Sequence, residues 1–386
     1  MFSFCDSNFE FHVKSAKCRG FTFLAYNVSK MKTILTLFIL TLVGSCLTAR
    51  TPKQTFDQWD KDKNGKLSIE ELPLDARPNF KRVDRNQDGS ISPDEHEAFV
   101  KRSRDPRQPR PLPEGVQAFR NLSYAGTDNP RQTLDLFLPK DRKKDESLPM
   151  IVYVHGGGWK NGSKESVIGK LAPYLNTGFF AAAAINYRLS GESIWPSQIH
   201  DCKAAIRWLK GNAKEYGFDP DGLAVWGNSA GGHLVAMMGV SGDVKSLEGK
   251  LGKHLVEDSR VNCVVDFCGP THLLSMGKFP SKIDHNSPNS PESQLIGGAI
   301  QENKKLADNA SPITYVTRDD APILIVHGTD DPLVPFNQAK IFHAALRKAG
   351  VKSDFLEMEG MGHGLGGGEV DSRVRKFLES QLLGKK

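Results

Sequence analysis

The 386-residue chain is poor in cysteine and carries little excess charge of either sign. It has six cysteines, and only Cys202, Cys263 and Cys268 lie beyond the N-terminal segment. Cys263 and Cys268 are five positions apart in a strand-like run, so we expect their side chains to point to opposite faces. This argues against a local disulfide, and we interpret the three cysteines as small buried apolar residues.

The formal net charge is only +6, and much of the excess lies in the segment KRSRDPRQPRP, residues 101–111. A nucleic-acid partner would need a basic face interleaved with aromatic residues, and the sequence contains none. We therefore expect no nucleic-acid binding and interpret the basic segment as a solvated linker. The histidines also lack a metal-ligand spacing within any one element, which argues against a histidine metal site.

Residues 31–49, MKTILTLFILTLVGSCLTA, have the parts of a secretory signal: flanking lysines, an apolar core and small residues at the end. The core is too short to cross a bilayer as a stable anchor. Because such signals begin a chain, we interpret Met31 as the true start and residues 1–30 as a mis-assigned extension. Cleavage is expected after Ala49. In a second interpretation VGSC resembles a lipoprotein box, and Cys46 carries the lipid. Both interpretations predict export, as a secreted, periplasmic or lipid-anchored protein.

Two near-copies of one acidic pattern follow, DKDKNGKLSIEE at residues 60–71 and DRNQDGSISPDE at residues 84–95. Each pattern resembles the EF-hand calcium loop, in which a hard cation takes oxygen ligands, a glycine permits the sharp turn and the last glutamate binds through both oxygens. We expect two structural Ca²⁺ sites. The first would use Asp60, Asp62, Asn64, Ser68 and Glu71 with the carbonyl of Lys66, and the second Asp84, Asn86, Asp88, Ser92 and Glu95 with the carbonyl of Ser90.

The two loops predict a small module over residues 50–101. Its expected core is formed by Phe56, Trp59, Leu72, Phe80, Val83 and Phe99. Pro73 would cut short the helix after the first loop, and Pro93 lies inside the second loop, so we expect a structural calcium clip rather than a sensor. A dockerin-like module that binds a protein or cell-wall partner is the alternative. Residues 102–115 are rich in proline and arginine, which predicts an extended linker.

From residue 116 to residue 386 the pattern alternates between apolar strands and amphipathic helices, which predicts an α/β domain with a largely parallel sheet covered on both faces. The expected strands cover residues 133–139, 150–156, 179–188, 222–228, 261–269, 321–328 and 352–360. The clearest helices are expected at residues 197–217 and 336–350. Open sheets of this kind place their chemistry at the carboxyl ends of the strands.

Three segments at such strand ends carry reactive residues. In WGNSAGGH, Ser229 lies between Gly227 and Gly231 in a G-x-S-x-G pattern, at the corner between a strand and a helix. In HGGGW, the backbone N–H groups of Gly157 and Gly158 are expected to form an oxyanion hole with that of Ala230.

HGTDDPLVP and GMGHGLGGG contribute an acid and His363. A serine needs a base to take its proton, a histidine titrates near neutrality, and a buried carboxylate fixes the imidazole tautomer. The order Ser229, Asp, His363 is that of α/β-hydrolases, and Asp331 fits the acid position better than Asp330 does.

With these motifs, residues 120–384 resemble the HGGG-type α/β-hydrolases, which include hormone-sensitive-lipase-like esterases and bacterial acetyl or feruloyl esterases. The resemblance rests on HGGGW, NYRLS, WPSQIHDCKAAIRWL, WGNSAGGH, ASPITYV and HGTDDPLVP. The lipase-like branch commonly reads Y-R-L-A-P-E where this chain reads YRLSGESIWP, so the bacterial polysaccharide-associated branch fits better.

The resemblance implies a serine carboxylesterase without a catalytic cofactor that acts on small acyl esters, such as acetyl or feruloyl groups on polysaccharides. Residues 270–309 are expected to cap the site and set its specificity. Two alternatives stay open: an arylformamidase or peptidase with the same triad, and a calcium-dependent adhesion or docking protein with a hydrolase scaffold.

Overall fold

The structure is a computed structural model, and it describes residues 52–73, 76–77, 80–104, 112–142 and 147–384. The predicted extension, signal and lipid-anchor cysteine all precede this range and lie outside the described residues. Among the helices of the described ranges, none is both long and apolar enough to cross a membrane.

The N-terminal module consists of two loops and short helices: α2 (Pro52–Trp59), α3 (Phe80–Val83) and α4 (Pro93–Arg104). A single antiparallel bridge pairs Leu67 with Ile91, the aliphatic residues of the two loops. The predicted core residues pack together, and Leu67 and Ile91 join them as its most buried members. The residues described between the first loop and α3 form no α-helix, whereas Pro93 begins α4, a position where its missing N–H costs nothing. Helix α4 continues to Arg104, inside the segment predicted as linker.

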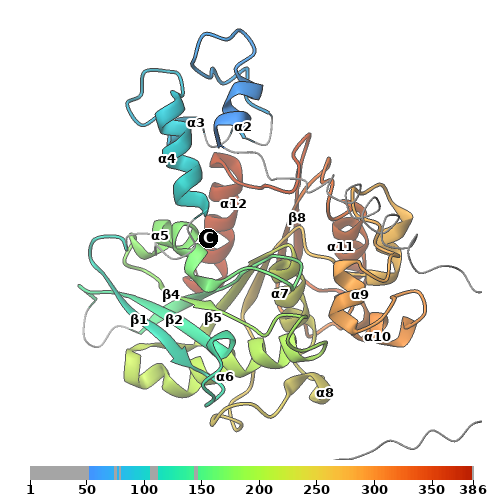
Figure 1. The fold of residues 1–386 in the computed structure, drawn as a ribbon. Helices are drawn as coiled ribbons and strands as arrows, with labels where there is room; N and C mark the ends of the chain where they lie inside the picture. The colour runs from blue at the N-terminus through green and yellow to red at the C-terminus, as the bar shows by residue number, and fades with distance from the viewer. Residues whose placement is uncertain (1–51, 74–75, 78–79, 105–111, 143–146, 385–386) are drawn as a thin grey trace, which may run out of the picture. The chain divides into compact units, whose positions relative to one another are not determined.

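The large domain is built on one eight-stranded sheet with the strand order β1-β2-β4-β3-β5-β6-β7-β8 (Figure 1). The strands are β1 (Val116–Ser123), β2 (Thr133–Pro139), β3 (Leu148–Val154), β4 (Ala181–Ile185), β5 (Phe218–Asn228), β6 (Cys263–Phe267), β7 (Ile323–Gly328) and β8 (Ser353–Met358). Pairs β1/β2 and β2/β4 are antiparallel, and every other pair is parallel. The carboxyl ends of β3, β5, β6, β7 and β8 therefore meet at one edge.

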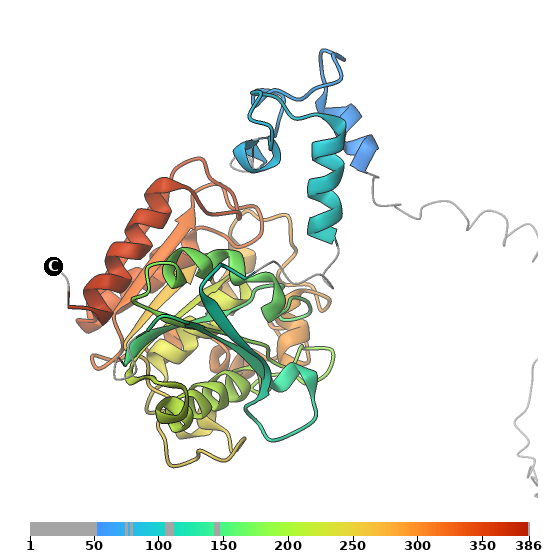
Figure 2. The same ribbon diagram turned by 90° about the vertical axis from the view of Figure 1, so that its left-hand side faces the viewer.

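Helices cover both faces of this sheet, and each face has its own apolar core. Residues of α5 (Ile168–Leu175) and α12 (Gly368–Leu382) pack on one face. Residues of α6 (Ser197–Tyr216), α7 (Ala230–Val240) and α11 (Asn337–Ala349) pack on the other. In Figure 2, α12 (red) and α6 (yellow-green) lie on opposite sides of the strands. The predicted α/β-hydrolase fold, a largely parallel sheet covered by helices, is confirmed.

The predicted cap region holds short helices: α9 (Pro291–Ile296), α10 (Lys304–Asn309) and the 3-10 turn η4 (Leu273–Lys278). A further short helix, α8 (Lys245–Glu248), lies between α7 and β6. The indole N–H of Trp195 donates to the Asn309 side chain (2.7 Å), and its backbone N–H donates to the Leu295 carbonyl (2.8 Å). These two bonds attach the cap region to the start of α6.

The structure corrects one expectation about the cysteines. Cys202, Cys263 and Cys268 are free and buried, as predicted. However, Cys263 and Cys268 belong to the same apolar core and do not point to opposite faces. The reason is that β6 ends at Phe267, and Cys268 has a left-handed backbone (φ 44°) that breaks the alternation.

Candidate active site

Ser229 lies in the turn between β5 and α7, and its backbone is strained (φ 55°, ψ −123°). Its N–H donates to the carbonyl of Phe267 at the end of β6 (2.8 Å). The flanking glycines are required by close backbone contacts. A Cβ on Gly227 would lie 2.3 Å from the Gly231 carbonyl oxygen, and one on Gly231 would lie 2.2 Å from that of Val154. The local sequence therefore forces the serine onto a corner, next to the end of β3.

The HGGGW loop begins where β3 ends and lies against this corner. A Cβ on Gly156 would be only 3.3 Å from the Cβ of Ser229. Gly157 has a φ of 118°, and a Cβ there would lie 2.3 Å from the Asn161 carbonyl oxygen. Within the described part of the chain, the backbone N–H groups of Gly157, Gly158 and Ala230 donate to no other group. Such free donors beside a serine are suited to stabilising a developing oxyanion.

His155 braces this loop. Its ring stacks on Tyr187 (centroids 4.4 Å apart), its Nδ1 pairs with the Gly156 carbonyl (2.8 Å), and the Tyr187 hydroxyl donates to the His155 carbonyl (3.0 Å). Burial lowers the pKa of His155 to about 4, so the ring is neutral at physiological pH. A neutral, stacked imidazole is a structural element.

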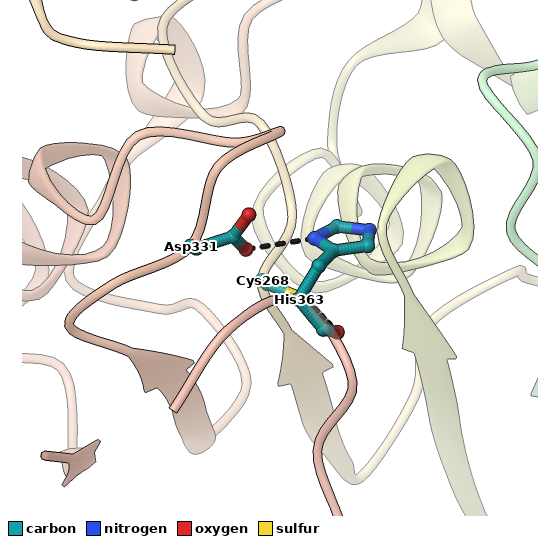
Figure 3. Close-up of side chains that lie close together, drawn as sticks. All are labelled: Cys268, Asp331 and His363. Atoms are coloured by element: carbon teal, nitrogen blue, oxygen red, sulfur yellow. Dashed lines mark hydrogen bonds and ion pairs between the residues drawn. The ribbon is translucent and has the colours of Figure 1, made fainter. Parts of the chain in front are cut away.

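Asp331 and His363 are joined directly: Nδ1 of His363 lies 2.7 Å from Oδ2 of Asp331 (Figure 3). The other carboxylate oxygen accepts hydrogen bonds from the N–H groups of Leu333 (2.8 Å) and Val334 (3.0 Å). Burial alone would raise the pKa of Asp331, but hydrogen bonds from His327 and His363 outweigh it and hold the pKa far below its ordinary value. The carboxylate is therefore ionised and oriented, as a base-orienting acid must be. Asp330 is exposed, whereas Asp331 is buried.

Contacts at the end of β6 connect Ser229 indirectly with the Asp331–His363 pair. Its N–H donates to Phe267, and the next residue, Cys268, places its thiol 3.7 Å from the His363 carbonyl oxygen. Among the described residues, no hydrogen bond joins the Ser229 hydroxyl to His363. Such contacts are often long in ligand-free enzymes and shorten when substrate binds.

Two residues near the acid were not predicted from the sequence. Cys268 contacts His363 as described above. Asp266, in β6, is fully buried, and burial raises its pKa to about 6. One of its carboxylate oxygens accepts from Gly269 N–H (2.9 Å), and the other has no partner among the described groups. Both residues lie in an apolar run, which is why the pattern indicated only a strand.

Trp159, in the HGGGW loop, and Trp195, before α6, are almost completely buried. Both rings pack edge-on against His233, and the Trp159 indole N–H donates to its Nδ1 (3.2 Å). Nε2 of His233 pairs with the Ala310 carbonyl (2.7 Å). This cluster belongs to the buried core and packs against the loops that carry Trp159 and Trp195. Helix α9 does approach the oxyanion loop, because a Cβ on Gly158 would lie 3.5 Å from Cβ of Pro291.

A cavity of about 560 Å³ is lined in part by the acid loop. Its lining comes from residues 279–282 and residues 329–340 and includes Asp331. Neither Ser229 nor His363 is among its described lining residues, so it adjoins the reacting groups without containing them.

The two acidic loops of the N-terminal module have matching internal geometry. Gly65 N–H donates to Asp60 (2.9 Å) and Gly89 N–H to Asp84 (3.0 Å), both with left-handed glycines. Glu71 accepts from Ser68 N–H (2.8 Å), and Glu95 accepts from Ser92 N–H (2.9 Å). These backbone hydrogen bonds lower the pKa of both glutamates.

Oxygen atoms of the first loop converge as a calcium ligand set requires. Carboxylate oxygens of Asp60, Asp62 and Glu71 lie within 4.8 Å of one another. In the second loop, the hydroxyl and N–H of Ser90 lower the pKa of Asp88 to about 2, which keeps that carboxylate ionised. Both loops therefore present anionic oxygen donors that fit Ca²⁺.

Comparison with known families identifies the family to which this chain belongs. The BD-FAE profile matches residues 134–346, just over half of the chain, and the match spans the oxyanion loop, Ser229 and Asp331. The chain belongs to the BD-FAE family. An EF-hand profile matches residues 53–72 and 80–100, which confirms the predicted EF-hand pair.

Relatives of this BD-FAE protein are named esterases. Esterase LipC of Mycobacterium tuberculosis is 30% identical over 251 residues, which cover 61% of this chain and 58% of LipC. The chain thus spans about half of the length of the curated relatives it matches, from 48% to 58%. Among solved structures, a truncated carbohydrate esterase from gut microbiota is 34% identical, with a TM-score of 0.65 over 71% of this chain and 99% of that one. A bifunctional GH43-CE protein of Bacteroides eggerthii is 30% identical, with a TM-score of 0.64 over 68% of this chain and 38% of that one.

Proposed function

We propose that this BD-FAE protein is a serine carboxylesterase in which Ser229 is the nucleophile, His363 the base and Asp331 the orienting acid. The observation that carries the proposal is the buried, ionised Asp331 bonded to His363 at 2.7 Å, at the same sheet edge as a strained serine and free backbone donors. Esterases among the relatives support the reaction class.

In the proposed mechanism, Asp331 holds the Nδ1 proton of His363, which leaves Nε2 free to take the proton of the Ser229 hydroxyl. The serine oxygen attacks the ester carbonyl, and the new oxyanion accepts hydrogen bonds from Gly157, Gly158 and Ala230. His363 then returns the proton to the leaving alcohol, which yields an acyl-enzyme. Water repeats the same steps and releases the acid.

The substrates we infer are small acyl esters, in particular acetyl or feruloyl groups on polysaccharides. Support comes from the structural neighbour described as a carbohydrate esterase and from the cap region, whose Pro291 lies against the oxyanion loop. Specificity would then depend on residues 270–309 rather than on Trp159 or Trp195, which are buried.

We further propose that the EF-hand pair holds two structural Ca²⁺ ions and that the protein is exported. The paired anionic loops support the first proposal, and the signal-like segment at residues 31–49 supports the second. Calcium has no part in the ester chemistry, because no ligand of the acidic loops belongs to the proposed triad.

Hydrolysis of p-nitrophenyl acetate by the full chain tests the reaction, with Ser229→Ala as the inactive variant. Exposed Ser246, whose hydroxyl has no described partner, provides the matched control Ser246→Ala. We expect activity in the wild type and control and none above background in Ser229→Ala. Feruloylated and acetylated glycans, N-formylkynurenine and peptide anilides would then be compared. Faster turnover of the amide-type substrates would contradict the esterase assignment.

A further inference from the structure

Cys268, Asp331 and His363 bring three kinds of metal-binding atom to one place. The Cys268 sulfur, an Asp331 carboxylate oxygen and a His363 ring nitrogen all lie within 4.8 Å of one another (Figure 3). Each residue follows a different strand, β6, β7 or β8, so the parallel sheet brings three separate loops to one edge. We propose that this cluster is an inhibitory site for a thiophilic divalent cation of the Zn²⁺ class.

The three ligand atoms of the cluster determine which kind of ion it prefers. Sulfur, imidazole nitrogen and carboxylate oxygen are the ligands that Zn²⁺ prefers, and three protein ligands leave one position for water. Ca²⁺ takes oxygen ligands and has little affinity for a thiolate. The chain therefore offers two metal environments of opposite preference: the oxygen-lined EF-hand loops and the mixed cluster at His363.

Charge balance favours the ion once it reaches the cluster. The Cys268 thiol gives its proton to solvent when the sulfur binds the cation. One thiolate and the ionised Asp331 then neutralise the two positive charges. A neutral site is compatible with the burial of Cys268 and Asp331, whereas an uncompensated charge there would be costly. His363 is partly exposed (21%), so the ion approaches from its side.

Binding at this cluster would stop the proposed reaction for a chemical reason. The cation replaces the proton between Nδ1 of His363 and Asp331, and the imidazole proton moves to Nε2. Nε2 is the atom that must accept the proton of the Ser229 hydroxyl. With a proton already on it, the base is blocked, and Asp331 no longer orients the ring. This inhibition rests on the proposed esterase function, but ion binding itself does not.

The inhibition test uses the full chain with saturating Ca²⁺ present throughout. Zn²⁺ is titrated against p-nitrophenyl acetate hydrolysis, and each variant is scored relative to its own rate without Zn²⁺. Cys268→Ser keeps a hydroxyl that can donate to the His363 carbonyl but removes the thiolate. Cys263→Ser is the matched control, because Cys263 is equally buried, begins the strand β6 that Cys268 follows, and is not part of the cluster. We expect equal inhibition of the wild type and Cys263→Ser. Cys268→Ser should need at least about tenfold more Zn²⁺.

The binding test is independent of activity. Co²⁺ replaces Zn²⁺ in the Ser229→Ala protein, and a thiolate-to-cobalt charge-transfer band is recorded in the near ultraviolet. We expect the band in Ser229→Ala and its loss when Cys268→Ser is added. Equal Zn²⁺ sensitivity of the wild type and Cys268→Ser, or no cobalt band, would overturn the site. A cobalt band combined with no esterase activity in the wild type would instead refute the proposed function and leave the metal site standing.

Discussion

His327 and His363 share one oxygen of Asp331. Nε2 of His327 lies 3.2 Å from Oδ2, and Nδ1 of His363 lies 2.7 Å from the same atom. Nε2 of His327 also lies 3.0 Å from the Val334 carbonyl, so this nitrogen must carry a proton to serve both acceptors. His327 is completely buried, so its contact with the acid is shielded from solvent and helps to hold Asp331 in place.

Removing this second donor should weaken catalysis through Asp331. Hydrogen bonds to charged groups contribute about 1.5–3 kcal/mol, so we expect His327→Leu to lower kcat by roughly ten- to a hundredfold. His327→Gln keeps an N–H near the Nε2 position and should restore much of the rate. The pKa of Asp331 would rise in the leucine variant, so activity should disappear at a higher pH on the acid side. Unchanged pH–rate profiles in both variants would show that His327 contributes only to packing and has no effect on the Asp331 carboxylate.

The residues of the proposed site could be predicted from the sequence because each lies in a recognisable loop after an apolar strand. Ser229, Asp331 and His363 follow β5, β7 and β8, and the parallel strands bring those loops to one edge. The contacts of Asp266 and Cys268 depend on strand register and on the left-handed turn at Cys268, and no local pattern encodes these. Strand β1 was also missed, because only its first residue is buried and it ends in the polar sequence RNLS.

The oxyanion loop offers a sharper test of geometry. A Cβ on Gly157 would meet the Asn161 carbonyl oxygen at 2.3 Å in a backbone that already has a left-handed φ. We expect Gly157→Ala to shift the loop and lose roughly 10²–10³ in kcat, the usual cost of one oxyanion donor. Gly178 also has a positive φ but nothing within 4 Å of a Cβ, so Gly178→Ala isolates the effect of backbone strain. Steady-state kinetics should show a loss only in the first variant.

The buried carboxyl group of Asp266 should make stability depend on pH. Burial raises its pKa from 3.8 to about 6, so the folded state keeps the proton up to a higher pH than the unfolded chain does. Stability is therefore highest below about pH 4 for this group and falls as the pH rises through 6, by roughly 3 kcal/mol at most. Asp266→Asn should lose less stability between pH 5 and 8 in denaturant titrations. The exposed Glu302→Gln is the control, and a wild-type pH dependence in Asp266→Asn would contradict this assignment.

The EF-hand pair should bind calcium independently of the ester chemistry. Glu71 and Glu95 occupy equivalent positions and accept equivalent backbone hydrogen bonds, so both already point into their loops. Calorimetry of the full chain should therefore find two Ca²⁺ ions, and Glu71→Gln or Glu95→Gln should each weaken the binding of one of them, because the amide cannot bind through two anionic oxygens.

Removal of Ca²⁺ should lower the melting temperature of residues 52–104, whose small core is marginal without ions. Initial rates with p-nitrophenyl acetate should stay unchanged after chelation at a temperature where the large domain is folded. The opposite outcome would be that the wild type loses activity as calcium is removed and that added Ca²⁺ restores activity in neither glutamine variant. The ions would then support the catalytic domain as well as their own loops.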